Sequence, residues 1–596
     1  CVHCGEILIL EEKKHCTECG VELEEGVTEC PNCGCPVDDT IGQETDEKPQ
    51  KVEVTGVKVT KKIKVIIGIV IALRTTYYND IVCWIIDGCK QKFLDLVNGW
   101  IRILIRDKEK RMQNDLLNPD LFGNEAGEDE DKKRLGDYYL EKEKNKIFHD
   151  VNRKLGFVRA RKGVGKSALL NYSAYKVEEK YKNDMVINIK ASELIALYEC
   201  DDYQSLHYIN CWQQRICLRI LNEIAKKIKF AATDDSMKII ENAEIMGYKG
   251  KNIISALSDR IALNLDKKII QKKNSDKEIA NGFEILKRYS EEKDQRVWLF
   301  IDDIDATFIN TENNMIMVGT FFTACRYLVN SVSGLNIRAS VRTDVWTMLR
   351  NYDEALDKCE QYMLDLVWST KDTGEILYNK LYTYFSEEHP ELNLGEKNFK
   401  DEKSLNDVFN LVFNGQLKWG KNWVIPYRSI HILGAGRPRW AAQLCKIAAK
   451  DAFEKQKEKI ATGNVNFAMT EYGKFRMADL YKEHRHQCSN LEMIIEIFRN
   501  GKKSYSTSEL IEVIKKSLID NGKKIYIDGL PDECNEVQIG KYLYRIGFIT
   551  LRNNEYNRAL GLTRYEDDPY LFSEYNIDDQ QIWEIHPAYR TVLKIR

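Results

Sequence analysis

Residues 155–167 have the sequence L-G-F-V-R-A-R-K-G-V-G-K-S, and our prediction of the fold begins there. The apolar residues at 155–158 predict a short buried strand. A turn with two glycines follows, and Lys166 and Ser167 then open an apolar helical run. A strand, a glycine turn, Lys-Ser and a helix together form the context of a Walker A motif, in which backbone N–H groups and the helix N-terminus bind phosphate oxygens.

This loop predicts a nucleotide site. Lys166 is expected to neutralise the β- and γ-phosphates, and the Ser167 hydroxyl is expected to bind Mg²⁺. Ala160 stands where the motif usually has its first glycine. If the φ angle there is positive, we expect alanine to cost about 1 kcal/mol. The predicted nucleotide-binding residues are Ala160, Gly163, Val164, Gly165, Lys166, Ser167, Ala168 and Pro438.

A second stretch, residues 297–305, has the sequence V-W-L-F-I-D-D-I-D. An unbroken apolar run that ends in acids predicts a buried parallel strand with carboxylates at its C-terminal end, as in a Walker B motif. We expect Asp302 to hold Mg²⁺ and Asp303 to orient the attacking water, with Asp305 as an accessory acid. Residues 335–342 predict the next core strand. Arg342, at its tip, is expected to sense the γ-phosphate, and a surface salt bridge is the alternative.

The C-terminal segment predicts a winged helix. Helical patterns at 491–498, 508–518 and 537–546 are followed by strands at 548–551 and 582–585. Lys541 and Arg545 on the third helix could read DNA. Acidic residues are plentiful here, however, which opposes DNA binding, and the family resemblance given below implies instead a module that holds the nucleotide domain shut, which we favour. His586 is expected to be structural.

Together, R-K-G-V-G-K-S, L-F-I-D-D-I-D, the strand-end R-T-D and G-R-P-R resemble a family of bacterial P-loop ATPases related to STAND, KAP and AAA+ NTPases. The similarity extends from N-P-D-L-F-G at 118–123 to the C-terminus. It implies an ATPase core, a helical lid and a terminal winged helix. Pro438 belongs to a G-x-P motif that packs near adenine in such proteins, and Arg437 and Arg439 are candidate lid sensors. The family often occurs in phage-defence neighbourhoods, which implies a role in defence.

Three C-x-x-C-G turns predict a small zinc ribbon at 1–38, because two such knuckles supply the four thiolates of a structural zinc site. Seven of the 17 cysteines lie within the first 35 residues. One pairing uses the second and third knuckles, which we favour, and the other uses the first and second. The favoured zinc ligands are Cys16, Cys19, Cys30 and Cys33, and the alternative set is Cys1, Cys4, Cys16 and Cys19.

A polar linker at 39–60 leads to a hydrophobic and amphipathic helical segment at 61–112. Its apolar run is too short to span a bilayer without including charged residues. We expect the segment to pack on the ATPase body, and a membrane surface or a partner helix is the alternative. The sequence shows no secretory signal, so we expect a cytoplasmic protein, with membrane association as the alternative.

The totals agree with a globular ATPase. The 596 residues carry a net charge of −3, with 43% hydrophobic and 30% charged residues, so no overall basic field indicates nucleic acid. We therefore expect an α/β protein with a P-loop NTPase parallel-sheet core at 113–350. A helical lid is expected at 351–480 and a C-terminal winged helix at 481–596, in addition to the N-terminal ribbon.

Three functions are compatible with these motifs. We favour an ATP- and magnesium-dependent switch, in which ATP binding closes the core, lid and winged helix and slow hydrolysis resets them. The second is an ATPase stimulated by nucleic acid through the winged helix. The third is a non-enzymatic adaptor with a degenerate P-loop, which Ala160 favours and Lys166, Ser167 and Asp302 oppose. A protein partner could bind the ribbon or the winged helix. Oligomerisation stays open, because the sequence shows no arginine finger.

Overall fold

The computed structural model describes most of the chain from residue 113 onward. The described residues are 113–195, 204–227, 238–240, 243, 282–292, 295–572 and 578–595, without 126, 128, 307, 531 and 553–560. The predicted zinc ribbon, linker and hydrophobic segment at 1–112 therefore lie outside them. In the part that is described, no helix is both long enough and apolar enough to cross a membrane.

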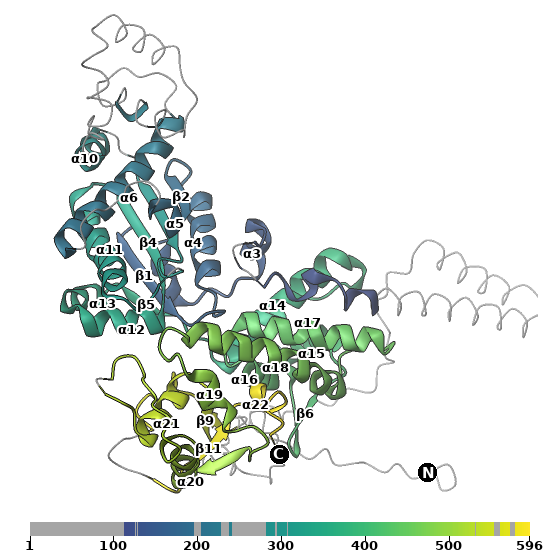
Figure 1. The fold of residues 1–596 in the computed structure, drawn as a ribbon. Coiled ribbons are helices and arrows are strands. Elements are labelled where there is room, and N and C mark those ends of the chain that lie inside the picture. The colour runs from purple at the N-terminus through teal and green to yellow at the C-terminus, as the bar shows by residue number, and fades with distance from the viewer. Residues whose placement is uncertain are drawn as a thin grey trace, which may run out of the picture.

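A five-stranded parallel sheet forms the first module (Figure 1). Its strand order is β2-β3-β4-β1-β5, so β4 lies between the two strands that carry the predicted motifs. The strands are apolar along most of their length because helices cover both faces. They are β1 (Leu155–Ala160), β2 (Met185–Lys190), β3 (Val297–Asp302), β4 (Leu335–Arg342) and β5 (Met363–Asp365).

Side chains from alternate positions of the strands pack into two separate cores. Phe157 and Leu299 face one core, together with the helices α6 (Ser205–Lys227), α11 (Glu312–Ser331) and α12 (Thr343–Tyr352). Val158 and Trp298 face the other core, which α4 (Lys166–Lys180) covers. In Figure 1, α4 and α11 accordingly lie on opposite sides of the sheet.

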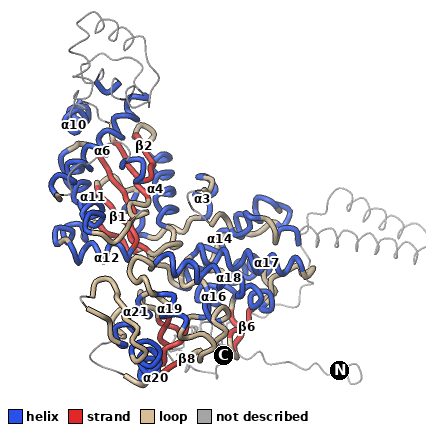
Figure 2. Tube along the Cα trace, viewed as in Figure 1, coloured by secondary structure: helices blue, strands red, loops and turns tan. Residues whose placement is uncertain are grey.

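The second module is helical and lies beside the sheet domain (Figure 2). One hydrophobic cluster joins its helices to Leu121 and Phe122, which lie just after the start of the described chain. Pro438 stands at the first turn of α17, where its missing N–H costs no hydrogen bond. The helices are α14 (Thr370–Glu388), α15 (Glu402–Val412), α16 (Pro426–Leu433), α17 (Pro438–Glu454) and α18 (Thr462–His484). A hairpin of β6 (Leu417–Trp419) and β7 (Asn422–Val424) projects from this lid.

The third module is the winged helix that the sequence predicts. Its antiparallel sheet has the order β10-β9-β11-β8 and packs with the helices around Trp583. Asn535 and Gln538 form a capping box at the start of α21, the third helix of the module. Its elements are α19 (Leu491–Glu496), β8 (Ser504–Ser506), α20 (Thr507–Ile514), α21 (Glu536–Arg545), β9 (Ile549–Arg552), β10 (Leu562–Thr563), β11 (Ile582–Ile585) and α22 (Pro587–Arg590).

Candidate nucleotide site

The loop between β1 and α4 has the geometry of a phosphate-binding loop. Gly163 and Gly165 have φ angles of 81° and 111°, a region that side chains rarely adopt. Gly165 is also the N-cap of α4, and no side chain caps the helix there. The first N–H groups of α4 therefore have no side-chain acceptor and can bind an anion.

Ala160 fits this loop without backbone strain. It is the last residue of β1, is buried, and pairs with Arg342 of β4 in the sheet register. Among the described residues with positive φ angles, the loop contributes only Gly163 and Gly165. The cost expected for a non-glycine residue with positive φ therefore does not arise at Ala160.

Lys166 and the acids of β3 meet at the carboxyl edge of the sheet. Lys166 is 8% exposed, and its Nζ donates to the Ala160 carbonyl at 3.1 Å. The Ser340 hydroxyl on β4 donates to Asp302 Oδ1, which also accepts the backbone N–H of Asp303 at 3.0 Å. These bonds orient Asp302 and leave its Oδ2 without a bond from any described residue.

Arg342 is held by two carboxylates. Its Nε lies 2.6 Å from Asp305 Oδ2, and its Nη2 lies 3.7 Å from Asp344 Oδ2. Burial alone would lower the pKa of Arg342, but Asp344 and Asp305 raise it above its ordinary value, so the guanidinium stays charged. Burial raises the pKa of Asp305, although Arg342 and Lys166 oppose that shift. The structure thus fixes the charged Arg342 guanidinium at the tip of β4, paired with Asp305 and Asp344.

A cavity of about 360 Å³ brings most of the predicted site residues together. Asp305 and Arg439 line it as well, whereas Ala160 and Asp302 lie beside it. Sequence reasoning missed its aromatic and lid residues, which come from segments with no motif of their own. The predicted residues that line it are Gly163, Val164, Gly165, Lys166, Ser167, Ala168, Asp303, Arg342 and Pro438, and the missed ones include Tyr138, Tyr139, Trp368, Ile376 and Lys380.

The missed residues add aromatic, apolar and lid side chains to the lining of the cavity. Trp368 fixes this part of the lining to the loop, because its Nε1 donates to the Val164 carbonyl at 2.7 Å. Lys380 of α14 donates to the Phe122 carbonyl at 2.9 Å, and burial lowers the pKa of Lys380 to about 8. Aromatic and apolar side chains with a few polar groups are what a nucleobase pocket requires.

The two arginines predicted as lid sensors lie in different places. The Arg439 N–H donates to the Gly163 carbonyl at 3.2 Å, and its side chain lines the nucleotide cavity. Arg437 lies on the other side of the loop, where its Nη1 donates to the Lys162 carbonyl at 3.2 Å and pairs with Glu483 at 2.7 Å. Of the two, only Arg439 is positioned to meet a nucleotide.

Strand order, glycine loop and acidic strand end together define a P-loop NTPase fold with a strand inserted between the two motif strands. No protein-family model matches the sequence, and no curated protein matches it. Among solved structures, the ORC2 protein of Aeropyrum pernix in ADPNP and ADP complexes is 12% identical, with a TM-score of 0.36 over 77% of this chain and 95% of that one.

Two further solved structures cover similar shares. The Aeropyrum pernix ORC1 protein in complex with DNA is 12% identical, with a TM-score of 0.29 over 78% of this chain and 96% of that one. A RuvB variant of Thermotoga maritima is 13% identical, with a TM-score of 0.25 over 72% and 94%. These TM-scores are too low to support a conclusion about this chain. The assignment to the P-loop NTPase fold therefore rests on the strand order and the site described above.

Proposed function

We propose that the chain is an ATP-binding, magnesium-dependent ATPase that acts as a slow nucleotide-regulated switch. The observation that carries this proposal is the phosphate loop, which the lid and the winged helix both contact through hydrogen bonds. A nucleotide bound in the loop would therefore change contacts that reach all three modules.

The donor set fits the triphosphate and its metal. The loop N–H groups and Lys166 are suited to phosphate oxygens. The Ser167 hydroxyl and Asp302 Oδ2 are hard oxygen ligands of the kind that Mg²⁺ prefers. When bound, Mg²⁺ would neutralise charge on the β- and γ-phosphates.

Asp303 is the residue we propose to orient the attacking water. It lines the cavity, next to Asp302 in sequence. In hydrolysis the water oxygen bonds to the γ-phosphorus, the bond from that phosphorus to the bridging oxygen breaks, and ADP leaves with the electron pair. The Asp303 carboxylate can accept the water proton, and Arg342 is placed to stabilise the charge of the transferred group.

The position of α21 favours a switch over a DNA-stimulated enzyme. The Arg545 and Ile546 carbonyls at the end of α21 accept bonds from Arg161 of the phosphate loop. The Arg545 side chain lies over the Tyr542 ring and lines a cavity that faces the ATPase core. The C-terminal end of α21, including Arg545, is therefore engaged with the ATPase core.

The test is ATP turnover by the full chain, with and without Mg²⁺ and duplex DNA. We expect slow, Mg²⁺-dependent turnover and retained ADP, both lost in Lys166→Ala. Lys176→Ala is the matched control, because this lysine lies on the same helix and, among the described residues, contacts Glu179 and the Tyr172 and Tyr175 rings. Strong stimulation by DNA would make the second function the leading one. If the chain binds no nucleotide, the non-enzymatic adaptor becomes the leading function.

A role in phage defence rests on the family resemblance alone, and we propose it on that ground. Its test is the plaque count on bacteria that carry the wild-type chain or Lys166→Ala. Protection that disappears with the variant is expected, and equal plaque counts without the chain would overturn the role.

A further inference from the structure

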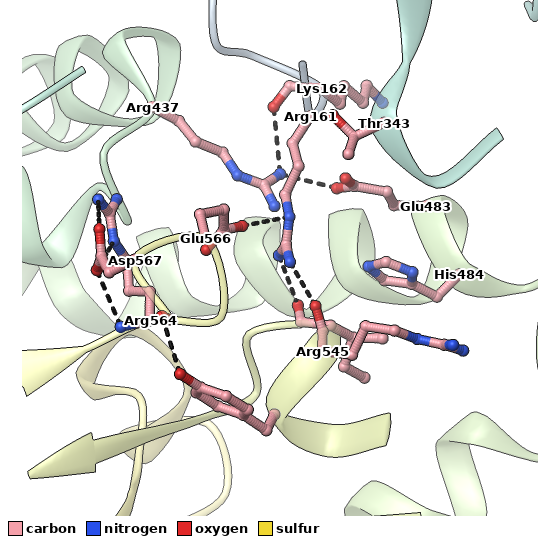
Figure 3. A network of polar contacts seen from close by, with 12 residues as sticks. Arg161, Lys162, Thr343, Arg437, Glu483, His484, Arg545, Arg564, Glu566 and Asp567 are labelled. Carbon is pink, nitrogen blue, oxygen red and sulfur yellow. Dashed lines mark hydrogen bonds and ion pairs between the residues drawn. The ribbon is translucent and has the colours of Figure 1, made fainter. Parts of the chain in front are cut away.

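Arg161 of the phosphate loop reaches into the winged helix (Figure 3). Its Nη1 donates to the Ile546 carbonyl at 3.2 Å, its Nη2 donates to the Arg545 carbonyl, and its Nε pairs with Glu566. The side chain is 14% exposed. All three guanidinium nitrogens are thus used by one module that lies more than 380 residues away in sequence.

The end of α21 is built to receive this guanidinium. The last carbonyls of a helix have no partner within it and carry the negative end of the helix dipole. Gly547, which follows Ile546, has a φ of 76°, and a Cβ there would lie 3.1 Å from Arg161 Nη1. Glycine therefore serves both the turn that ends the helix and the close approach of Arg161.

Two further arginines connect the same region. Arg437 of the lid holds the Lys162 carbonyl, the next residue of the loop, and is itself paired with buried Glu483. Burial would raise the pKa of Glu483, but Arg437 and His484 hold it at about 2, so the pair stays charged. Arg564 of the winged helix lies against the lid loop, where a Cβ on Gly436 would be 1.9 Å from its Nη1.

Among the described residues, no hydrophobic cluster joins the sheet domain to the winged helix, although His486 contacts Phe308 and pairs with Asp344 of the core. A cavity of about 800 Å³ opens at this junction, lined by Arg161, Arg437, Arg545, Arg564 and Glu566 among others. The charged hydrogen bonds of Arg161 therefore carry much of the direct contact between the phosphate loop and the winged helix. Such a contact can be broken without opening a packed core.

We infer that Arg161 is a positioning residue, through which the winged helix sets the conformation of the phosphate loop and hence its affinity for nucleotide. The inference rests on the nucleotide binding proposed above but not on hydrolysis. The winged helix holds residue 161 and the lid holds residue 162. Residues 163–167 are the part of the loop whose backbone N–H groups would bind the phosphates. Coupling between two sites is reciprocal, so nucleotide must also stabilise the end of α21.

The experiment measures binding and release of a fluorescent ADP analogue by the full chain. We expect Arg161→Ala to weaken binding about tenfold and to speed release by a similar factor, which corresponds to about 1.4 kcal/mol. Arg161→Lys keeps the charge, but its three donors share one nitrogen and cannot reproduce the fork by which three guanidinium nitrogens meet separate acceptors, so it should lose most of this affinity. Glu566→Gln preserves shape and should lose less, and its effect should shrink when Arg161 is already alanine.

Arg499 is the matched control, because within the winged helix it makes the same two kinds of contact, to a backbone carbonyl and to a glutamate. Its Nη1 donates to the Val592 carbonyl at 3.2 Å, and its other nitrogens pair with Glu496. Arg499→Ala should leave ADP affinity unchanged. Hydrogen exchange supplies the reciprocal readout: ADP should slow exchange of the 546–548 amides in the wild type and not in Arg161→Ala.

The outcomes separate this inference from the proposed function. Unchanged ADP affinity in Arg161→Ala, or full additivity of the Arg161 and Glu566 variants, overturns the inference while nucleotide binding stands. A wild-type chain that binds ADP without hydrolysing ATP overturns the ATPase and still tests Arg161. A wild-type chain that binds no nucleotide overturns both. If Arg161→Ala does not fold, Glu566→Gln and the exchange measurement decide.

Discussion

Asp303 has a left-handed backbone, with a φ of 56°, directly after the strand that supplies Asp302. Asparagine tolerates this conformation nearly as well as aspartate. Asp303→Asn should therefore keep the fold and nucleotide binding while removing the proton acceptor. We expect single-turnover hydrolysis to slow by about 10²–10³-fold, in line with a general base. An unchanged rate, or an equal loss of ATP affinity, would remove Asp303 from the proposed role.

Arg338 is a buried arginine of β4 that bonds to the protein backbone. Its guanidinium lies 5.1 Å from the Trp298 ring. Burial lowers the pKa of Arg338 to about 9, so it is still charged at neutral pH. It donates to the carbonyls of Ile147, Phe148, Asp150, Arg153, Lys154 and Ile337.

Replacing Arg338 should therefore destabilise the core. Arg338→Met leaves those carbonyls without their donor, and we expect a loss of about 3 kcal/mol or more in the free energy of unfolding. Denaturant unfolding measures it. Arg350→Met is the control, because its pairs with Asp357 and Glu360 are both partly exposed and should contribute under about 1 kcal/mol each. Equal losses in both variants would contradict the assigned role of Arg338.

At the level of elements, the sequence predicts those whose signal is local. The apolar runs of β1 and β3 stand beside a glycine turn or paired acids, and the winged-helix helices carry their own periodicity. The aromatic and lid residues that line the cavity lack such a signal. Tyr138 and Lys380 lie more than 200 residues apart in sequence, and packing of α14 against α3 (Lys132–Tyr138) brings Lys380 Nζ within 5.1 Å of the Tyr138 ring. Nothing in the local sequence marks Arg161 either, because its partners lie in the winged helix, more than 380 residues away.

The segment between β5 and α14 supplies one further test. Trp368 is 4% exposed, and its indole N–H satisfies the Val164 carbonyl of the phosphate loop. Trp368→Phe fills most of the same volume but leaves that carbonyl unpaired. We expect ATP affinity to fall about 3- to 10-fold, equivalent to one hydrogen bond of about 0.5–1.5 kcal/mol. Titration with a fluorescent analogue measures it, and unchanged affinity would show that Trp368 only fills space.

At the scale of the whole molecule, the phosphate loop is where three modules meet. The core supplies β1 and α4, the lid contributes the Arg439 N–H to Gly163, and the winged helix holds Arg161. Neither neighbouring module can move far without changing a bond to this loop. This arrangement explains how a change in nucleotide could reach α21 across an open cavity.

The lid and the winged helix also meet around a cavity of about 210 Å³, which His431 and His586 both line. His586 Nε2–H donates to the Ile432 carbonyl at 3.0 Å, and His431 Nδ1 lies 2.7 Å from the Thr373 hydroxyl. Burial lowers both pKa values to about 3, with Arg590 contributing at His586 and Arg564 at His431. Both rings are therefore neutral where the modules join.

Acid should destabilise the folded state through these two histidines. Each histidine has an ordinary pKa of 6.5 when unfolded, so below that pH the unfolded chain binds more protons than the folded one. The stability that the two neutral histidines contribute is fully present above about pH 6.5, and it is lost as the pH falls towards about 3. One pKa unit is about 1.4 kcal/mol, so at about pH 5 each histidine should cost about 2 kcal/mol. Thermal unfolding followed from pH 7.5 to 5 should show this loss. The side chain in His586→Asn cannot titrate, so the melting temperature of this variant should depend less steeply on pH. An identical pH dependence would show that His586 does not cause the loss of stability.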